Sequence, residues 1–149
     1  METVEKSIDI DVPVSTAYNQ WTQFEEFPRF MEGVESVKQL DDTHLHWVAN
    51  VGGERKEWTA QITEQIPDQR IAWRSEGGEF TAGVVTFQPL SPNCAHVTVR
   101  LNYEPKGITE KIGDMLGVVS NRVQRDLERF KDFIEARGQE TGAWRGTVR

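Results

Sequence analysis

The chain contains a single cysteine, Cys94, and no hydrophobic run long enough to cross a bilayer. One cysteine excludes a disulfide framework and a cysteine-rich zinc site, and a membrane-spanning helix needs about 20 consecutive apolar residues. Residues 1–11 alternate charged and apolar side chains and lack the basic-then-apolar order of a secretion signal. We therefore expect a cytoplasmic protein with no transmembrane segment.

Positive charge is also scarce. The chain has 17 lysine and arginine residues against 24 aspartate and glutamate residues, a net charge of -7 at pH 7. Because a surface of this sign repels phosphate, nucleic acid is excluded as the main partner. The deficit lies in residues 1–105, with a net charge of -9, whereas residues 106–149 carry +2. No linker-like composition separates the two parts, which indicates a change of element within one domain.

Apolar side chains at alternate positions are the main structural signal, and they are typical of strands with one buried face. The strands are expected over residues 3–12, 34–40, 44–51, 55–66, 70–76, 79–88 and 94–104. Tight turns between them, such as Gly52-Gly53, favour an antiparallel sheet. In residues 34–40 the apolar spacing of three predicts a β-bulge.

Helices are expected before and after this run of strands. Ser15 is a candidate N-cap for a short helix over 16–23, and Phe27–Met31 forms a second short helix or turn. From Thr109 the apolar residues recur every three or four positions, and Gly138 suits the end of the helix. A helix of about 29 residues is about 43 Å long, enough to lie across a whole sheet.

Six stretches of the sequence, taken with this order of elements, resemble a known superfamily. They are Ile8–Trp21, Phe27–Val37, Pro67–Ser75, Gly83–Leu90, Leu101–Pro105 and Arg125–Gly138. They resemble the START / Bet v 1-like (SRPBCC) superfamily, in its polyketide cyclase/dehydrase and coenzyme-Q-binding START branch. The resemblance implies the α+β helix-grip fold, in which a curved antiparallel sheet of about seven strands surrounds one long C-terminal helix. It also implies a ligand cavity between sheet and helix.

Strand alternation predicts which side chains face that cavity. Three of the five tryptophans fall on the dry face, beside small residues such as Ala49, Ala60 and Gly83. The expected ligand-binding residues are Trp47, Trp58, Trp73, Phe87, Leu101, Tyr103, Met115 and Val119. The alternative, that these aromatic side chains simply fill the core, stays open.

Groups able to catalyse a reaction or hold a metal are few on this face. Tyr103 carries the one inward hydroxyl and is a weak candidate for a catalytic acid, because acid–base catalysis needs a tuned group beside the reacting atom. The pairs His44/His46 and Cys94/His96 have ligand spacing but lie on the solvent face of strands that are not neighbours. We expect no metal and no cofactor, and the balance favours binding over turnover.

Two other segments have alternative interpretations. The alternating charges after Arg122, which include Asp126, are typical of a solvated helix face. Phe27, Phe30 and Met31 are expected to form an exposed apolar lip at the cavity entrance, suited to transient membrane contact during lipid loading. The alternative is that they cap the end of the core.

The leading hypothesis is a protein that binds a hydrophobic small molecule of polyketide, quinone/isoprenoid or lipid type. The alternatives are a polyketide aromatase/cyclase or dehydratase with Tyr103 as the acid, and a protein-interaction module whose partner binds Phe27–Met31. Residues 1–138 would form the single ligand-binding domain. The tail, residues 139–149, is expected to be flexible, or Trp144 docks on the domain or on a second copy. The expected assembly is a monomer or a weak homodimer.

Overall fold

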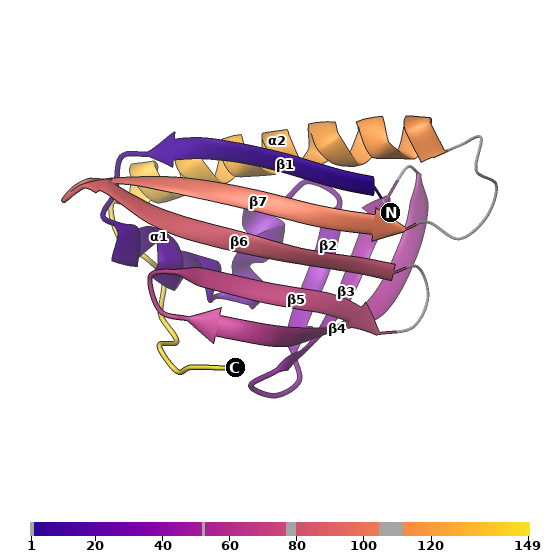
Figure 1. Cartoon of the computed structure of the whole chain (residues 1–149), viewed down its shortest axis with the longest axis horizontal. Coiled ribbons are helices and arrows are strands. Elements are labelled where there is room, and N and C mark those ends of the chain that lie inside the picture. The colour runs from indigo at the N-terminus through magenta and orange to yellow at the C-terminus, as the bar shows by residue number, and fades with distance from the viewer. Residues whose placement is uncertain (1, 52, 77–79, 105–111) are drawn as a thin grey trace.

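The chain folds into a seven-stranded antiparallel sheet and one long C-terminal helix (Figure 1). The computed structural model describes residues 2–51, 53–76, 80–104 and 112–149. The strands are β1 Glu2–Ile10, β2 Val34–Gln39, β3 His44–Val51, β4 Glu54–Ile66, β5 Arg70–Glu76, β6 Phe80–Ser91 and β7 Cys94–Glu104. The helices are α1 Val14–Trp21, the 3-10 helix η1 Phe24–Arg29 and α2 Ile112–Arg137. The predicted α+β helix-grip fold is confirmed.

The order of the strands in the sheet is β1-β7-β6-β5-β4-β3-β2. β1 pairs with β7, whereas every other pair of neighbours is consecutive in the sequence. The predicted bulge lies in β2, where the register with β3 shifts between Val34 and Ser36. A second shift lies between Ile62 and Glu64 of β4. Such shifts bend a strand and increase its twist, and the sheet curls toward α2 (Figure 1).

The ends of the helices follow backbone chemistry. The prediction of Ser15 as the N-cap of α1 is wrong, because Pro13 occupies that position and makes no side-chain cap hydrogen bond. Proline has no N–H to satisfy, and the Pro13 carbonyl accepts the N–H of Ala17 at 3.2 Å. At the other end of the chain Gly138 follows α2 with a φ of 76°. The predicted glycine cap is confirmed.

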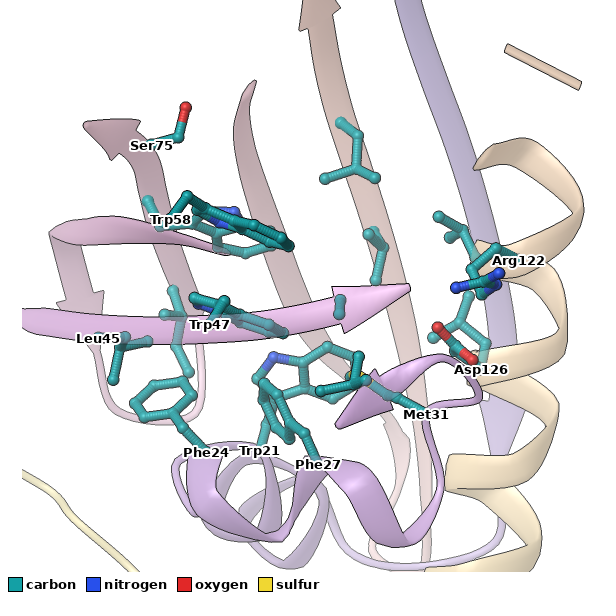
Figure 2. Close-up of a pocket in the computed structure, with 18 of the residues that line it drawn as sticks. Trp21, Phe24, Phe27, Met31, Leu45, Trp47, Trp58, Ser75, Arg122 and Asp126 are labelled. Carbon is teal, nitrogen blue, oxygen red and sulfur yellow. The ribbon is translucent and has the colours of Figure 1, made fainter. Parts of the chain in front are cut away.

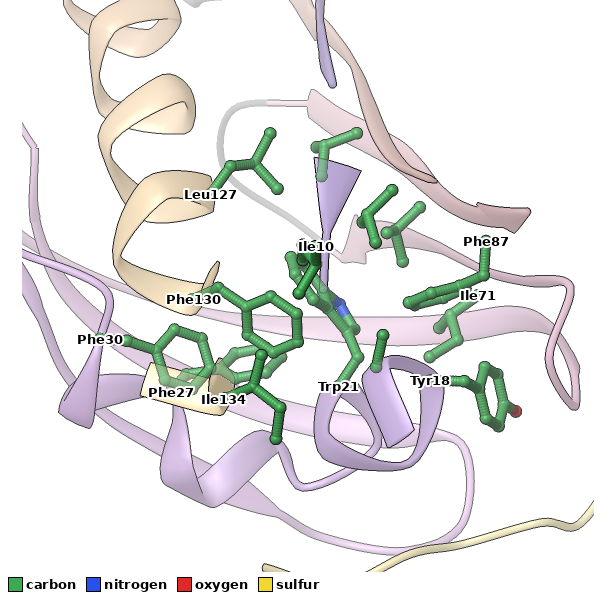
Figure 3. Close-up of a cluster of buried hydrophobic side chains, with 14 of the residues drawn as sticks. Ile10, Tyr18, Trp21, Phe27, Phe30, Ile71, Phe87, Leu127, Phe130 and Ile134 are labelled. Carbon is green, nitrogen blue, oxygen red and sulfur yellow. The ribbon is translucent and has the colours of Figure 1, made fainter. Parts of the chain in front are cut away.

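The core is a cluster of aromatic and aliphatic side chains between α1, η1, the sheet and α2 (Figure 3). The buried stripe of α2 consists of Val123, Leu127, Phe130 and Ile134. The Phe130 ring lies edge-on to Trp21, with ring centroids 4.9 Å apart, and 5.2 Å from Phe30. The three-and-four spacing of the sequence therefore predicted this face of the helix correctly.

The exposed lip predicted at Phe27, Phe30 and Met31 is wrong. Phe27 and Phe30 are each only 2% exposed, and Met31 is half-buried. The Phe27 ring packs against Phe30 and Trp21, with both centroid distances at 5.7 Å. These residues cap the core, as the alternative interpretation predicts, because the Phe30 ring packs against Phe130 of α2. The surface invoked for membrane or protein contact is therefore absent from this segment.

The tail, residues 139–149, for which both flexibility and docking through Trp144 are predicted, makes hydrogen bonds to the domain. The backbone N–H of Val148 donates to the carbonyl of Gln65 at 2.9 Å, and the Gln65 N–H donates back at 2.8 Å. The N–H of Trp144 donates to the Thr22 hydroxyl at 3.1 Å. The tail thus runs beside α1 and ends against β4 (Figure 1). The Trp144 contact agrees with the alternative that this residue docks on the domain.

Candidate functional site

A cavity of about 240 Å³ lies between the sheet and α2 (Figure 2). A single water molecule needs roughly 10–15 Å³ of such space, so the cavity has room for an organic ligand. Its lining comes from the end of α1, from η1, from β2–β5 and β7, and from α2. Most of the lining side chains are aromatic or aliphatic.

Tryptophans form one wall of the cavity. Trp47 and Trp58 are cross-strand partners in β3 and β4, and their rings are stacked with centroids 5.8 Å apart and planes 5° apart. The ring of Trp73 lies against Gly83 of β6, where a Cβ atom would be 2.6 Å from it and 2.7 Å from Leu101. Because Gly83 has no side chain, Trp73 and Leu101 can both pack against the backbone of β6 at this position. The result is a broad apolar wall.

The predicted ligand-binding residues divide into three groups. Trp47, Trp58, Trp73 and Leu101 line the cavity. Phe87 is buried but does not line the cavity. Its ring packs edge-on against Tyr18 of α1, with the ring centroids 5.3 Å apart. The side chains of Tyr103, Met115 and Val119 lie outside the described residues.

Several lining residues were not singled out from the sequence. Those on strands are Val34, Leu45, Ile62, Ile71 and Ser75, which the same alternation along each strand would have selected. Ala49, expected on the dry face, lines the cavity as well. Phe27 and Met31, predicted for the entrance, also line the cavity. Trp21 and Phe24 join them from the end of α1 and the start of η1, where no strand alternation applies.

Two charged side chains of α2, Arg122 and Asp126, also line the cavity (Figure 2). Their assignment to a solvated helix face is wrong. Nη1 of Arg122 donates to the carbonyl of Glu32 at 3.0 Å and to that of Asn50 at 3.1 Å. These bonds connect α2 to the end of β3 and to the segment before β2.

Gly33 makes room for this guanidinium. Its φ is 85°, a left-handed conformation that favours glycine. A Cβ atom at Gly33 would collide with Nη1 of Arg122 and lie 2.9 Å from the Asn50 carbonyl oxygen. The absence of a side chain at Gly33 therefore allows the Arg122 guanidinium to pack against the backbone there.

Asp126 lies one helical turn after Arg122 and accepts the backbone N–H of Glu32 at 3.2 Å. Burial raises the pKa of Asp126 from its ordinary value of 3.8 to about 7. The Glu32 N–H, Arg122 and Arg129 lower the pKa, but the loss of water around the carboxyl outweighs them. Near neutral pH this group can therefore either donate or accept a hydrogen bond.

Comparison with known proteins agrees with this geometry. Residues 10–132 match the family described as polyketide cyclase / dehydrase and lipid transport. The chain belongs to this family. An uncharacterized 17.2 kDa protein of Streptomyces lincolnensis is similar to it over nearly the whole length of both chains. The two sequences are 57% identical over 149 residues, which cover 99% of each chain.

Solved structures similar to this family member share its fold. A protein of Deinococcus radiodurans is 29% identical, with a TM-score of 0.72 over 91% of this chain and 98% of its own. The Zhui aromatase/cyclase from Streptomyces sp. R1128 is 15% identical, with a TM-score of 0.82 over 96% and 99% of the two chains. At that identity the likeness shows the fold alone.

The histidines of the family member lie on the outer face of the sheet, with carboxylate neighbours. Nδ1 of His44 is 3.0 Å from Asp41, and Nδ1 of His96 is 2.6 Å from Asp9. Within the described residues no group of histidine, cysteine and acidic side chains is arranged to hold a metal ion. In the same part of the chain, no helix is long and apolar enough to cross a membrane.

The raised pKa of Asp126 predicts how stability depends on pH. Because the folded state holds this proton more tightly than the unfolded state, stability should fall as pH rises from about 4 through about 7. Asp126→Asn keeps the acceptor for the Glu32 N–H and removes the buried charge. We expect this variant to be more stable than the native protein by roughly 2 kcal/mol at pH 8 and equally stable at pH 4. Urea unfolding at both pH values measures this, and an equal difference at both would contradict it.

Proposed function

We propose that this protein binds a hydrophobic small molecule of polyketide, quinone/isoprenoid or lipid type in the cavity between the sheet and α2. The observation that carries the proposal is the cavity of about 240 Å³ with the stacked rings of Trp47 and Trp58 in its wall. Burial of apolar ligand surface is worth about 25 cal/mol per Å². Flat rings stack favourably on tryptophan, which supports a ligand with a planar ring system.

A second candidate function is the conversion of a polyketide-type ligand, as in an aromatase/cyclase. The observation that favours it is the carboxyl of Asp126, which lines the cavity and has a pKa of about 7. A group with such a pKa can exchange protons with a bound ligand at neutral pH. If the protein is an enzyme of this kind, Asp126→Asn should abolish conversion of a candidate substrate and retain its binding. The role of Tyr103 as a catalytic acid stays a prediction. The same is true of the oligomeric state, a monomer or a weak homodimer.

Blocking the cavity from one strand tests the binding function. Val99 of β7 lines the cavity, whereas Val84 of β6 lies on the other face of the sheet. We expect Val99→Phe to weaken binding of the neutral fluorescent probe N-phenyl-1-naphthylamine by at least tenfold, because the added ring occupies the ligand's place. Val84→Phe makes the same chemical change outside the cavity and should alter the affinity by less than threefold. Fluorescence titration of both variants measures the effect.

Equal affinity of the two variants would mean that the probe binds elsewhere, and absence of probe binding to the native protein would oppose the proposed function. Native mass spectrometry of the purified protein supplies an independent test. A co-purifying apolar molecule, released by organic extraction, is the expected result.

A further inference from the structure

Charge enters the cavity at one place. Among the described lining residues only Arg122 and Asp126 carry a formal charge, and both lie on α2, opposite the tryptophan wall (Figure 2). A charge at the edge of an apolar cavity is costly unless it is paired or hydrogen-bonded. The hydrogen bonds that Arg122 and Asp126 make within the protein therefore determine what each side chain can still offer a ligand.

Arg122 retains hydrogen-bonding capacity. A guanidinium has five N–H donors, and Nη1 gives its hydrogens to the carbonyls of Glu32 and Asn50. Nε and Nη2 have no hydrogen-bond partner among the described residues. The protein thus fixes this side chain through one nitrogen and leaves the other two as donors of a positively charged group.

Asp126 retains capacity as well. One oxygen, Oδ1, accepts the N–H of Glu32, and Oδ2 has no hydrogen-bond partner in the described part of the chain. The charged groups around it are Arg122 and Arg129 on α2 and Glu32 from the segment before β2. Arg129 pairs with the Glu32 carboxylate at 3.1 Å outside the cavity, so the cation that lines the cavity is Arg122.

We propose that Arg122 and Asp126 bind an anionic oxygen, such as a carboxylate or phenolate, on an otherwise apolar ligand, and that binding transfers a proton from solvent to Asp126. This inference rests on the proposed function, since it names the chemistry of the ligand in the same cavity. The free donors of Arg122 match an anionic oxygen. Two negative charges side by side repel, so the ligand anion favours the protonated carboxyl. Protonated Asp126 then becomes a second donor.

The affinity for an anionic ligand should fall as the pH rises. Below pH 7 Asp126 is mostly protonated before the ligand arrives, so affinity should change little there. Above pH 7 each binding event must take up a proton, and affinity should fall by up to tenfold per pH unit. A neutral ligand of the same size gains nothing from the proton, so its affinity should be nearly constant.

Two fluorescent probes with the same ring system test this on the full-length protein. They are 8-anilinonaphthalene-1-sulfonate, which stays anionic throughout, and the neutral N-phenyl-1-naphthylamine. We expect the affinity for the anionic probe to fall about tenfold or more between pH 6.5 and pH 8.5, and that for the neutral probe to change less than threefold. Calorimetry at pH 8 in two buffers of different ionisation enthalpy should show proton uptake with the anionic probe only.

Three variants separate the contributions. Asp126→Asn should make binding of the anionic probe independent of pH, and Arg122→Gln should weaken it at least tenfold while the neutral probe still binds. Arg125→Gln removes the same charge from the solvent face of α2, where Arg125 is exposed, and should change either affinity less than threefold. Retained binding of the neutral probe shows that each variant is folded.

Two contrary results have different meanings. If the neutral probe binds and the anionic probe shows no pH dependence, no proton uptake or no loss in Arg122→Gln, the inference is overturned and the proposed function stands. If neither probe binds, or Val99→Phe leaves both affinities unchanged, the proposed function fails and the inference fails with it.

Discussion

Ending the chain at Gly138 is expected to lower the free energy of unfolding by roughly 3 kcal/mol, at about 1 kcal/mol for each of three buried polar groups that lose a partner. Two of these groups are Asn19 and Gln20 of α1, which are 8% and 0% exposed. Gln20 Nε2 donates to the Thr141 hydroxyl at 3.0 Å, and its Oε1 accepts the Thr141 N–H at 2.8 Å. Asn19 accepts from Nη1 of Arg145 at 2.7 Å.

The third group is the hydroxyl of Thr22, which is 2% exposed and accepts the N–H of Trp144. Arg145 adds two ion-pair hydrogen bonds to Asp68, at 3.0 and 2.9 Å. Trp21, the last residue of α1, lines the cavity. The truncated chain should therefore bind N-phenyl-1-naphthylamine more weakly as well.

Urea unfolding followed by circular dichroism measures this loss. The matched control is a chain that ends at Val148, which keeps every contact of the tail described above and lacks only Arg149. We expect the control to unfold like the full-length protein. An unchanged midpoint for the chain that ends at Gly138 would show that the docked tail adds nothing to stability.

Phe130→Ala is expected to cost about 3–5 kcal/mol of stability, because it leaves a cavity in a densely packed core. The Phe130 side chain is 0% exposed and contacts the rings of Trp21 and Phe30. Trp21 connects Phe130 with the ligand cavity, because its ring packs against Phe130 (Figure 3) and also lines the cavity. Removal of the Phe130 ring lets Trp21 move away from the cavity wall. Probe affinity should fall together with stability.

Phe133→Ala supplies the comparison from the next turn of α2. Phe133 is half-buried, and its ring lies 5.2 Å from the guanidinium carbon of Arg29 and 5.8 Å from that of Arg137. We expect a loss of about 1 kcal/mol and no change in probe affinity. Thermal unfolding ranks the two variants, and equal losses would argue against a special role of the Phe130 ring.

Local periodicity predicted the sheet and one wall of the cavity. Alternation placed Trp47, Trp58, Trp73 and Leu101 on the buried face, because neighbouring side chains of a strand must point to opposite sides. Alternation could not distinguish Phe87 from these residues. It predicts the face of the sheet on which a side chain lies, but not whether that part of the face borders the cavity or is covered by a helix. Tyr18 of α1 fills that end of the sheet.

The two charged residues of the site could not be predicted from the sequence, for a different reason. The charges of α2 alternate around the helix, and nothing in their spacing distinguishes Arg122 and Asp126 from exposed neighbours such as Arg125. The position of Arg122 depends on Gly33, which is 89 residues earlier in the chain and leaves room for the guanidinium. In the same way, the sequence around Gln20 does not indicate that this side chain is buried, because its partner Thr141 lies in the C-terminal tail. Contacts between distant segments decide both cases.

The pairing of β1 with β7 has a consequence for how the protein is made. The first strand, Glu2–Ile10, finds its partner only in residues 95–103. At a synthesis rate of roughly 5–20 residues per second, β1 waits several seconds on the ribosome before β7 emerges. During that time its edge is open to pairing with other nascent chains, and folding that depends on such a distant pairing is slow. The exposed face of β1, with Glu5 and Asp9, carries charges that oppose such association.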